Sequence, residues 1–493
     1  MRIQPWLIAV ALVATTLTAC TPNEAFRKNA AIPASVCKSA TPETFPPDCR
    51  QAITEKTAAY DLHFVEFDDQ GWTYPAVESG ASDGAKDASA GQLRLVMKRL
   101  HEAAAAHPVR IFVFVHGWKH NAAYDDDNVI HFRDFLDEAA QYEEIAQSGT
   151  RVIGVYVGWR GKSLHAGEPW ISTTFWDRKT VAQHVALGSV RELTAQLRAL
   201  QRQANRMQSG TDANTAPPSA VRVRIHLIGH SFGGLALYAA VSQSLVYSFV
   251  TGEDIDGKQA PVERLGDMIV LINPAFEATR YQPLDRVART RPYVVYQAPV
   301  FVAVTSEADE ATGKLFPLGR TLNTIFESEK TKEERDANRN TPGHIDAYLT
   351  HSLDLSGKGT PACQGWILEP ATPAEKAANI ALEFQNSQAF KEALVDGRWP
   401  LDAAGKPTAR EFCGLLDLIP LTKSARPYRD TDPNMPLWNV TVSSTIIAGH
   451  NDINSPIFRA FLRQLFRDED FSSRAARRLR PSCSCRSDRR RMR

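Results

Sequence analysis

A serine flanked by glycines is the residue in this chain whose surroundings best suit nucleophilic chemistry. Residues 227–234 have the sequence LIGHSFGG, which contains the pattern Gly-x-Ser-x-Gly centred on Ser231. A strand pattern over 221–228 precedes the serine, and an apolar helical pattern over 232–249 follows it. A sharp strand-to-helix turn exposes a serine hydroxyl, and the glycines avoid collisions with neighbouring backbone. The pattern therefore indicates a nucleophile at Ser231.

Strand and helix patterns alternate on both sides of this serine. Strands are predicted at 62–67, 110–115, 151–158, 221–228, 268–272, 300–304 and 441–447, and helices at 93–106, 128–146, 180–203, 232–249 and 456–466. Short apolar runs rich in β-branched residues are typical of strands buried on both faces. The alternation predicts an α/β fold, with a mostly parallel sheet and helices on both faces. The segment 313–440 shows no strand alternation, so we expect a large cap-like insertion before the last strand.

The serine motif and these elements together resemble the α/β-hydrolase superfamily over roughly residues 60–470. The resemblance implies an α/β-hydrolase core over 59–312 and 441–470, with 313–440 as the insertion. It also implies a chain order of serine, then acid, then histidine.

The resemblance implies that His450 is the base that activates the serine. Of the thirteen histidines, only His344, His351 and His450 follow the candidate acids. His450 lies after the last predicted strand and before a helix, where the superfamily has its base. The other two lie in the insertion, where surface histidines are expected.

The acid is expected after the strand at 300–304, where several carboxylates share one loop. Asp309 best matches the superfamily, and its role would be to accept the His450 N–H and stabilise the imidazolium. Glu307 in the same loop is the second candidate. Glu277, which follows the preceding strand, is the third candidate. The sequence therefore leaves three residues that could be the acid.

The loop His116-Gly117-Trp118 follows a buried strand upstream of the serine. In the superfamily such a loop supplies one backbone N–H of the oxyanion hole, and the residue after the nucleophile supplies the other. The resemblance therefore assigns these donors to Trp118 and Phe232. Such chemistry requires no cofactor, and no metal site is expected, because the histidines show no zinc-ligand spacing.

The N-terminus resembles a bacterial lipoprotein signal. The apolar run 6–19 is too short for a membrane-spanning helix, which needs about 20 residues, and it ends directly before Cys20. The resemblance implies that a signal peptide, 1–19, is removed and that Cys20 is lipidated, with 20–58 as a spacer. The expected location is the bacterial cell envelope, at the outer membrane or the periplasmic face rather than in the cytoplasm, because Thr21 replaces the aspartate that retains such proteins at the inner membrane.

Export also permits disulfides among the seven cysteines. Once the lipidated cysteine is set aside, six remain, which allow 15 pairings. Proximity in the chain favours Cys37 with Cys49 and Cys363 with Cys413.

The overall charge argues against a nucleic-acid partner. The chain has 57 Lys and Arg against 56 Asp and Glu, a formal net charge of +1. Positive charge gathers instead in the segment 471–493, an arginine-rich tail that we expect to be disordered.

These features predict a membrane-anchored serine hydrolase that cleaves carboxylic esters through a Ser-His-Asp triad and an acyl-enzyme. The expected partners are a small-molecule or lipid ester and the membrane, and the sequence does not indicate an oligomeric state. Two alternatives stay open. One is a lipase or phospholipase with an interfacial lid, and the other is a non-catalytic envelope-binding lipoprotein on a hydrolase scaffold.

Overall fold

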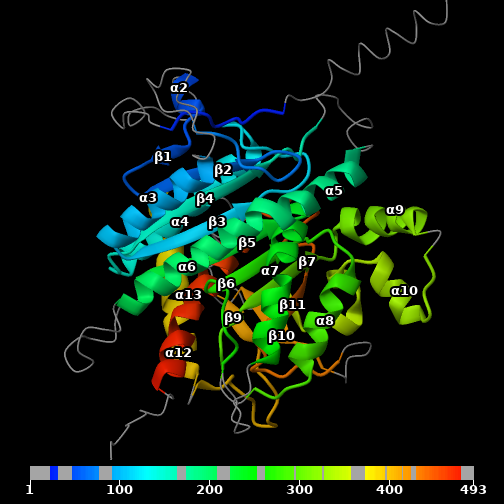
Figure 1. Ribbon diagram of the computed structural model, residues 1–493. Helices are drawn as coiled ribbons and strands as arrows, with labels where there is room; N and C mark the ends of the chain where they lie inside the picture. Colours follow the sequence, from blue (N-terminus) through cyan, green and yellow to red (C-terminus); the bar gives the residue numbers. More distant parts are fainter. Residues whose placement is uncertain are drawn as a thin grey trace, which may run out of the picture.

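Eleven strands form one sheet at the centre of the computed structural model (Figure 1). The structure describes residues 23–30, 47–76, 91–163, 174–207, 222–251, 261–293, 296–324, 327–356, 372–394, 397–412, 415–422 and 429–478. The strands are β1 (Thr54–Lys56), β2 (Tyr60–Phe67), β3 (Val109–Val115), β4 (Arg151–Trp159), β5 (Val223–His230), β6 (Met268–Ile272), β7 (Phe301–Ser306), β8 (His351–Leu355), β9 (Arg410–Phe412), β10 (Leu416–Pro420) and β11 (Leu437–Val442). The α-helices are α2 (Pro47–Arg50), α3 (Gln92–Ala106), α4 (Asp127–Ile145), α5 (Phe175–Val185), α6 (Arg191–Met207), α7 (Phe232–Val250), α8 (Ala278–Arg289), α9 (Phe316–Asn323), α10 (Lys332–Arg339), α12 (Pro373–Ala393) and α13 (Pro456–Arg478).

The sheet is mixed but mostly parallel. Its strand order is β1-β2-β4-β3-β5-β6-β7-β11-β8-β10-β9. Every neighbouring pair from β2 to β8 in this order is parallel. The antiparallel pairs are β1 with β2 at one edge, and β8 with β10 and β10 with β9 at the other. The predicted α/β architecture with a mostly parallel sheet is confirmed.

Helices cover both faces of the sheet, and the strands alternate between two cores. In β3, Ile111, Val113 and Val115 belong to the core that includes residues of α3, α5, α6, α7 and α8. Phe112 and Phe114 belong to the opposite core, which includes residues of α4, α12 and α13. Successive side chains of a strand point to opposite faces, so a continuous apolar run fills both cores at once.

Within the described part of the chain, α7 alone has the length and hydropathy of a membrane-crossing helix. However, 56% of its most apolar stretch is buried inside the protein. Its residues contribute to the core shared with α5 and α8. Because this burial accounts for its apolar character, α7 behaves as a core helix.

The segment 313–440 differs from the prediction of a strand-free insertion. Strands β8, β9 and β10 lie within it and extend the main sheet beyond β11. In addition, β11 begins at Leu437 and ends at Val442, earlier than the predicted 441–447. The expectation of a cap without strands is therefore wrong here. These strands are short, and only β8 pairs with β11, while β10 pairs with β8 and β9 pairs with β10.

The helix predicted over 180–203 is divided into α5 and α6. A short π-helical segment, η3 (Ala186–Val190), joins them, and Gly188 within it has the non-helical angles φ −91° and ψ −116°. The carbonyl oxygen of Gly71 accepts a 2.6 Å hydrogen bond from Ser189 and would lie 3.2 Å from a Cβ at position 188. The contact with a distant loop explains why helical periodicity alone does not reveal the break.

Described residues of the predicted spacer and of the predicted tail belong to the fold. Arg27, in the predicted spacer 20–58, is fully buried, and its backbone N–H donates to Glu66 at 2.8 Å. Its guanidinium forms an ion pair with Glu55 at 2.8 Å. At the other end, residues 471–478 of the predicted disordered tail continue α13. The described spacer residues are thus part of the folded body.

The predicted cysteine chemistry falls mostly outside the described residues. Cys49 is fully buried. Cys20, Cys37, Cys363 and Cys413 lie outside the described residues, so lipidation and the two disulfide pairings stay predictions.

Candidate active site

Ser231 lies in a strained turn between β5 and α7, as the motif predicts. Its backbone angles are φ 55° and ψ −119°, a conformation that non-glycine residues rarely adopt. Its backbone N–H donates to Ile272 at 3.0 Å, which fixes the turn against β6. A Cβ on Gly233 would overlap the carbonyl oxygens of Val115 and His116. The motif glycine therefore permits close backbone contact beside the serine.

The structure brings Ser231, His450 and Asp309 together. The Ser231 Oγ lies 2.8 Å from the His450 Nε2. The His450 Nδ1 lies 3.0 and 2.9 Å from the two carboxylate oxygens of Asp309. This arrangement suits the tautomer in which Nδ1–H donates to Asp309 and Nε2 accepts the serine hydroxyl proton.

Parallel strands explain why residues so far apart in the chain meet here. Ser231 follows β5, Asp309 follows β7, and His450 follows β11. These strands run parallel, so their carboxyl ends share one edge of the sheet. Ligand and reaction sites in open α/β sheets form at this edge.

Asp309 is nearly completely buried, but its surroundings still favour the charged form of its carboxyl group. Burial acts to raise the pKa of its carboxyl group, but hydrogen bonds from His450 and Thr312 and the His450 charge outweigh this effect and lower the pKa below its ordinary value. Thr312 donates through both its backbone N–H, at 3.0 Å, and its hydroxyl. The carboxylate is thus oriented from two sides.

The other candidate acids are occupied elsewhere or exposed. Glu307 is exposed to solvent, although its backbone N–H pairs with Val442. Glu277 is buried in an ion cluster with Lys179, with Arg280 at 2.9 Å and with Arg320 at 3.2 Å. Of the three carboxylates weighed from the sequence, Asp309 is the one that hydrogen-bonds to His450.

The alternative histidines also have other partners. His344 Nε2 lies 2.9 Å from the Thr312 hydroxyl, so it reaches Asp309 only through that residue. His351 is buried in β8, with Nδ1 2.8 Å from the Thr350 hydroxyl. The expectation of a surface position is therefore wrong for His351.

Hydrogen bonds to backbone carbonyl oxygens position His450 and the loop before it, and most of these hydrogen bonds were not predicted from the sequence. The carbonyl oxygen of His450 accepts hydrogen bonds at 2.9 Å from His230 Nε2 and from Asn273 Nδ2. Ser306 donates to the carbonyl oxygen of Ile447 at 2.6 Å, which holds the same loop. Asn273 has a positive φ of 45°, which asparagine tolerates better than most residues. The pair Asn-Pro at the end of β6 is the signal that could have identified it.

The candidate oxyanion donors lie beside the serine. Neither the Trp118 nor the Phe232 backbone N–H has a hydrogen-bond acceptor among the described residues. Gly117 lies so close to Ser231 that a Cβ at position 117 would be 2.9 Å from the serine Cβ. Two unpaired N–H groups next to a nucleophile are suited to stabilise a developing oxyanion.

His116 holds this loop instead of taking part in the triad. Its Nδ1 lies 2.8 Å from the Gly117 carbonyl oxygen, and its Nε2 accepts the backbone N–H of Trp159 at 3.0 Å. Burial lowers the pKa of His116 to about 4, so the imidazole stays neutral, as the second hydrogen bond requires.

Aromatic side chains gather next to the serine. The Phe175 ring lies 5.2 Å from the Trp118 ring and 4.7 Å from the Phe232 ring, measured between centroids. Trp176 and Phe316 continue this cluster at a centroid distance of 5.9 Å, which brings α9 against α5. The cluster gives this side of the candidate site an apolar wall.

Replacing Gly233 with alanine is expected to destabilise the fold by about 3 kcal/mol and to lower kcat by about 100-fold. The new methyl group would meet the backbone of Val115 and His116, so the loop that carries the oxyanion donors must shift. Urea unfolding and ester turnover measure the two effects. Gly449→Ala is the matched control, because a Cβ there meets nothing within 4 Å. A Gly233→Ala protein with parental stability would contradict the close approach.

Replacing Glu277 with glutamine is expected to cost about 3 to 5 kcal/mol near neutral pH. The substitution leaves Lys179 buried near Arg280 and Arg320 without its carboxylate. A second substitution, Lys179→Met, should recover most of the loss. Urea unfolding of the two single variants and the double variant measures the coupling between Glu277 and Lys179. A double variant whose loss of unfolding free energy equals the sum of the two single losses would contradict this coupling.

The same pair predicts a pH dependence. Burial acts to raise the pKa of Glu277, but Lys179 and Arg280 outweigh it and lower the pKa from 4.5 to about 2. The stability contributed by this carboxylate is therefore present above about pH 4.5 and is lost as the pH falls toward 2. The stability difference between the parent and Glu277→Gln should shrink across this window. A difference that stays constant down to pH 2 would refute this assignment.

Among the described residues, no group of three or more His, Cys, Asp or Glu side chains is arranged to hold a metal ion. Comparisons with protein-family models, with curated proteins and with solved structures found no match to this chain.

Proposed function

We propose that this protein is a serine hydrolase of the α/β-hydrolase type that cleaves carboxylic esters. The observation that carries the proposal is the hydrogen-bonded series from Ser231 Oγ through His450 to Asp309, with Ser231 at φ 55°. Serine is a weak nucleophile unless an oriented base accepts its proton. A structural role alone would not require a strained serine beside an oriented imidazole.

In the acylation step, Ser231 Oγ attacks the ester carbonyl carbon while His450 Nε2 takes the hydroxyl proton. The tetrahedral intermediate carries a negative oxygen, which the Trp118 and Phe232 backbone N–H groups stabilise. Asp309 stabilises the imidazolium. Collapse of the intermediate breaks the ester C–O bond, and His450 gives its proton to the departing alcohol.

In the deacylation step, water attacks the acyl-enzyme and His450 takes one of its protons. The second tetrahedral intermediate releases the carboxylic acid, and the proton returns to Ser231. The pair of steps consumes one water and one ester, and it yields one alcohol and one acid, with no cofactor.

The aromatic cluster supports a substrate with an apolar acyl or alcohol group. Trp118, Phe175 and Trp176 lie on the α5 side of the candidate site. Aromatic side chains offer large apolar contact area, so they favour hydrocarbon over strongly polar groups.

A panel of p-nitrophenyl esters from acetyl to palmitoyl tests the proposal, with a soluble form that lacks residues 1–20. We expect turnover that a fluorophosphonate probe abolishes by labelling Ser231. The chain-length optimum and the response to micelles separate an esterase from a lipase. A folded protein that neither turns over any ester nor reacts with the probe would instead favour a binding scaffold.

The proposal includes an envelope location through lipid on Cys20. Replacing Cys20 with serine is expected to abolish the incorporation of labelled palmitate, because this cysteine is the residue that carries the acyl chains. Cys485→Ser serves as the control, and it should incorporate palmitate as the parent does. A Cys20→Ser protein that still incorporates palmitate would contradict lipid anchoring.

A further inference from the structure

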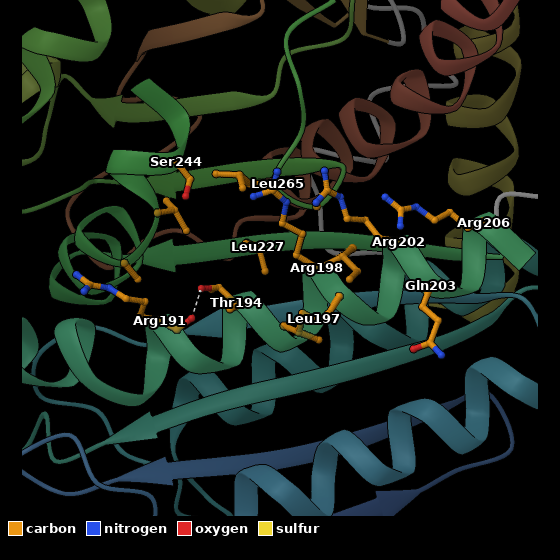
Figure 2. Close-up of a pocket in the computed structure, with 16 residues that line it drawn as sticks. Arg191, Thr194, Leu197, Arg198, Arg202, Gln203, Arg206, Leu227, Ser244 and Leu265 are labelled. Atoms are coloured by element: carbon orange, nitrogen blue, oxygen red, sulfur yellow. Dashed lines mark hydrogen bonds between the residues drawn. The ribbon is translucent and has the colours of Figure 1, made fainter. Parts of the chain in front are cut away.

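A cavity of about 640 Å³ lies between α6 and α7, over β5 (Figure 2). We name it the α6–α7 groove. Its apolar lining includes Leu197, Ile225, Leu227, Val241 and Leu265, all of them buried side chains. Pockets for small molecules commonly measure roughly 300 to 1,000 Å³ and have mainly apolar linings. The groove is therefore large enough and apolar enough to accept a hydrocarbon chain.

The groove is separate from the candidate active site. Ser231 lies at the N-terminal end of α7, whereas the groove is lined by Ala240, Val241 and Ser244 further along that helix. At 1.5 Å per helical residue, these positions lie roughly 14 to 20 Å from the serine along the helix axis. None of the three triad candidates lines the groove.

Arginines on α6 give the rim a positive charge. Arg191, Arg198, Arg202 and Arg206 all line the groove and come from this one helix, as Figure 2 shows. Glu263 forms ion pairs with two of them, at 2.8 Å from Arg198 and in direct contact with Arg202. Among the described residues, this one carboxylate forms the ion pairs within the set of four guanidinium groups, which leaves the rim electropositive and favours an anionic group there.

Arg198 offers a hydrogen-bond donor that no described residue uses. Its Nε atom is buried and has no hydrogen-bond partner in the described part of the chain, while another nitrogen of the same guanidinium binds Glu263. A buried donor without an acceptor is costly, and a ligand oxygen at this position would remove that cost. A carboxylate suits a guanidinium because its oxygens can accept from two N–H groups.

We propose that the α6–α7 groove binds a free, single-chain aliphatic carboxylate, with its tail on the apolar floor and its carboxylate at Arg198. The apolar floor and the cationic rim together select this class over a neutral alcohol, which lacks the charge, and over a small anion, which lacks the tail. This site goes beyond ester hydrolysis and does not depend on it.

Calorimetric titration with decanoate tests the proposal on the same soluble form that lacks residues 1–20, which avoids detergent. We expect one decanoate per chain, bound about tenfold more tightly than decanol of the same length. The variant Arg198→Gln should weaken decanoate binding about tenfold. Glu263 keeps Arg202 as a partner in this variant, so no carboxylate loses all its charge partners.

Ser244→Phe provides a second, charge-independent test, because the ring would fill the groove from α7. It should remove detectable decanoate binding. The matched controls are Gln243→Phe and Arg286→Gln, which change exposed residues outside the groove and should bind decanoate as the parent does.

Several outcomes would overturn the proposal. One is the absence of decanoate binding by the parent, and another is an affinity that both groove variants leave unchanged, which would assign the binding to a different place. Equal affinity for decanol would remove the carboxylate from the recognition. Binding to phosphatidylglycerol vesicles without binding to monomeric decanoate would assign the groove to a membrane surface instead.

Discussion

Replacing Ser231 with alanine is expected to lower kcat for ester hydrolysis by about 10⁶-fold. The substitution removes the only atom that can form the acyl-enzyme, while the oxyanion donors and the substrate contacts remain. KM should change little, because the hydroxyl contributes to the chemical step more than to substrate binding. Stopped assays on purified parent and variant with the best p-nitrophenyl ester measure both constants.

The control for this prediction is the integrity of the fold. Among the described residues, the Ser231 hydroxyl hydrogen-bonds only to His450, so its loss should change the unfolding free energy by only about 1 kcal/mol. Mass spectrometry after fluorophosphonate treatment should find the adduct in the parent and not in the variant. A folded variant that keeps a tenth or more of the parental kcat would exclude Ser231 as the nucleophile.

Replacing Asp309 with asparagine is expected to lower kcat by about 10⁴-fold. An amide N–H donated to His450 Nδ1 would favour the tautomer that carries its proton on Nε2. That imidazole could no longer accept the Ser231 proton, although the geometry would be nearly preserved. Steady-state kinetics should show the loss in kcat and not in KM.

Glu307→Gln is the matched control, because it makes the same chemical change in the same loop. Glu307 is exposed, whereas Asp309 is buried and contacts His450 through both oxygens. We expect Glu307→Gln to keep nearly full activity. A larger loss in Glu307→Gln than in Asp309→Asn would reverse the assignment of the acid.

Much of the fold could be predicted because its signals are local. The residues of β3 are apolar at every position but one, so a doubly covered strand is evident from seven neighbouring residues. The serine turn is likewise determined within a few positions, since glycines and a strained serine act on adjacent backbone. Both features could be predicted because the residues that determine them are neighbours in the chain.

The edge strands and the helix break escaped prediction for the opposite reason. Strands β8 and β10 are short and pair antiparallel with each other, and β8 also pairs with β11 from a later part of the chain. The kink at Gly188 is held by the carbonyl oxygen of Gly71, a residue in a different loop. Contacts between residues far apart in the chain do not produce a periodic pattern in the sequence next to either residue.

The order of residues along the chain was enough to identify the candidates for the site: the serine turn, the late histidine and a loop with several carboxylates. Their roles became clear from the folded chain, in which Asp309 contacts His450 while Glu307 is exposed to solvent, and His230 and Asn273 donate to the carbonyl oxygen of His450. Burial and hydrogen-bond geometry set these roles, and both depend on the parallel ordering of β5, β7 and β11, which brings residues 219 positions apart into contact.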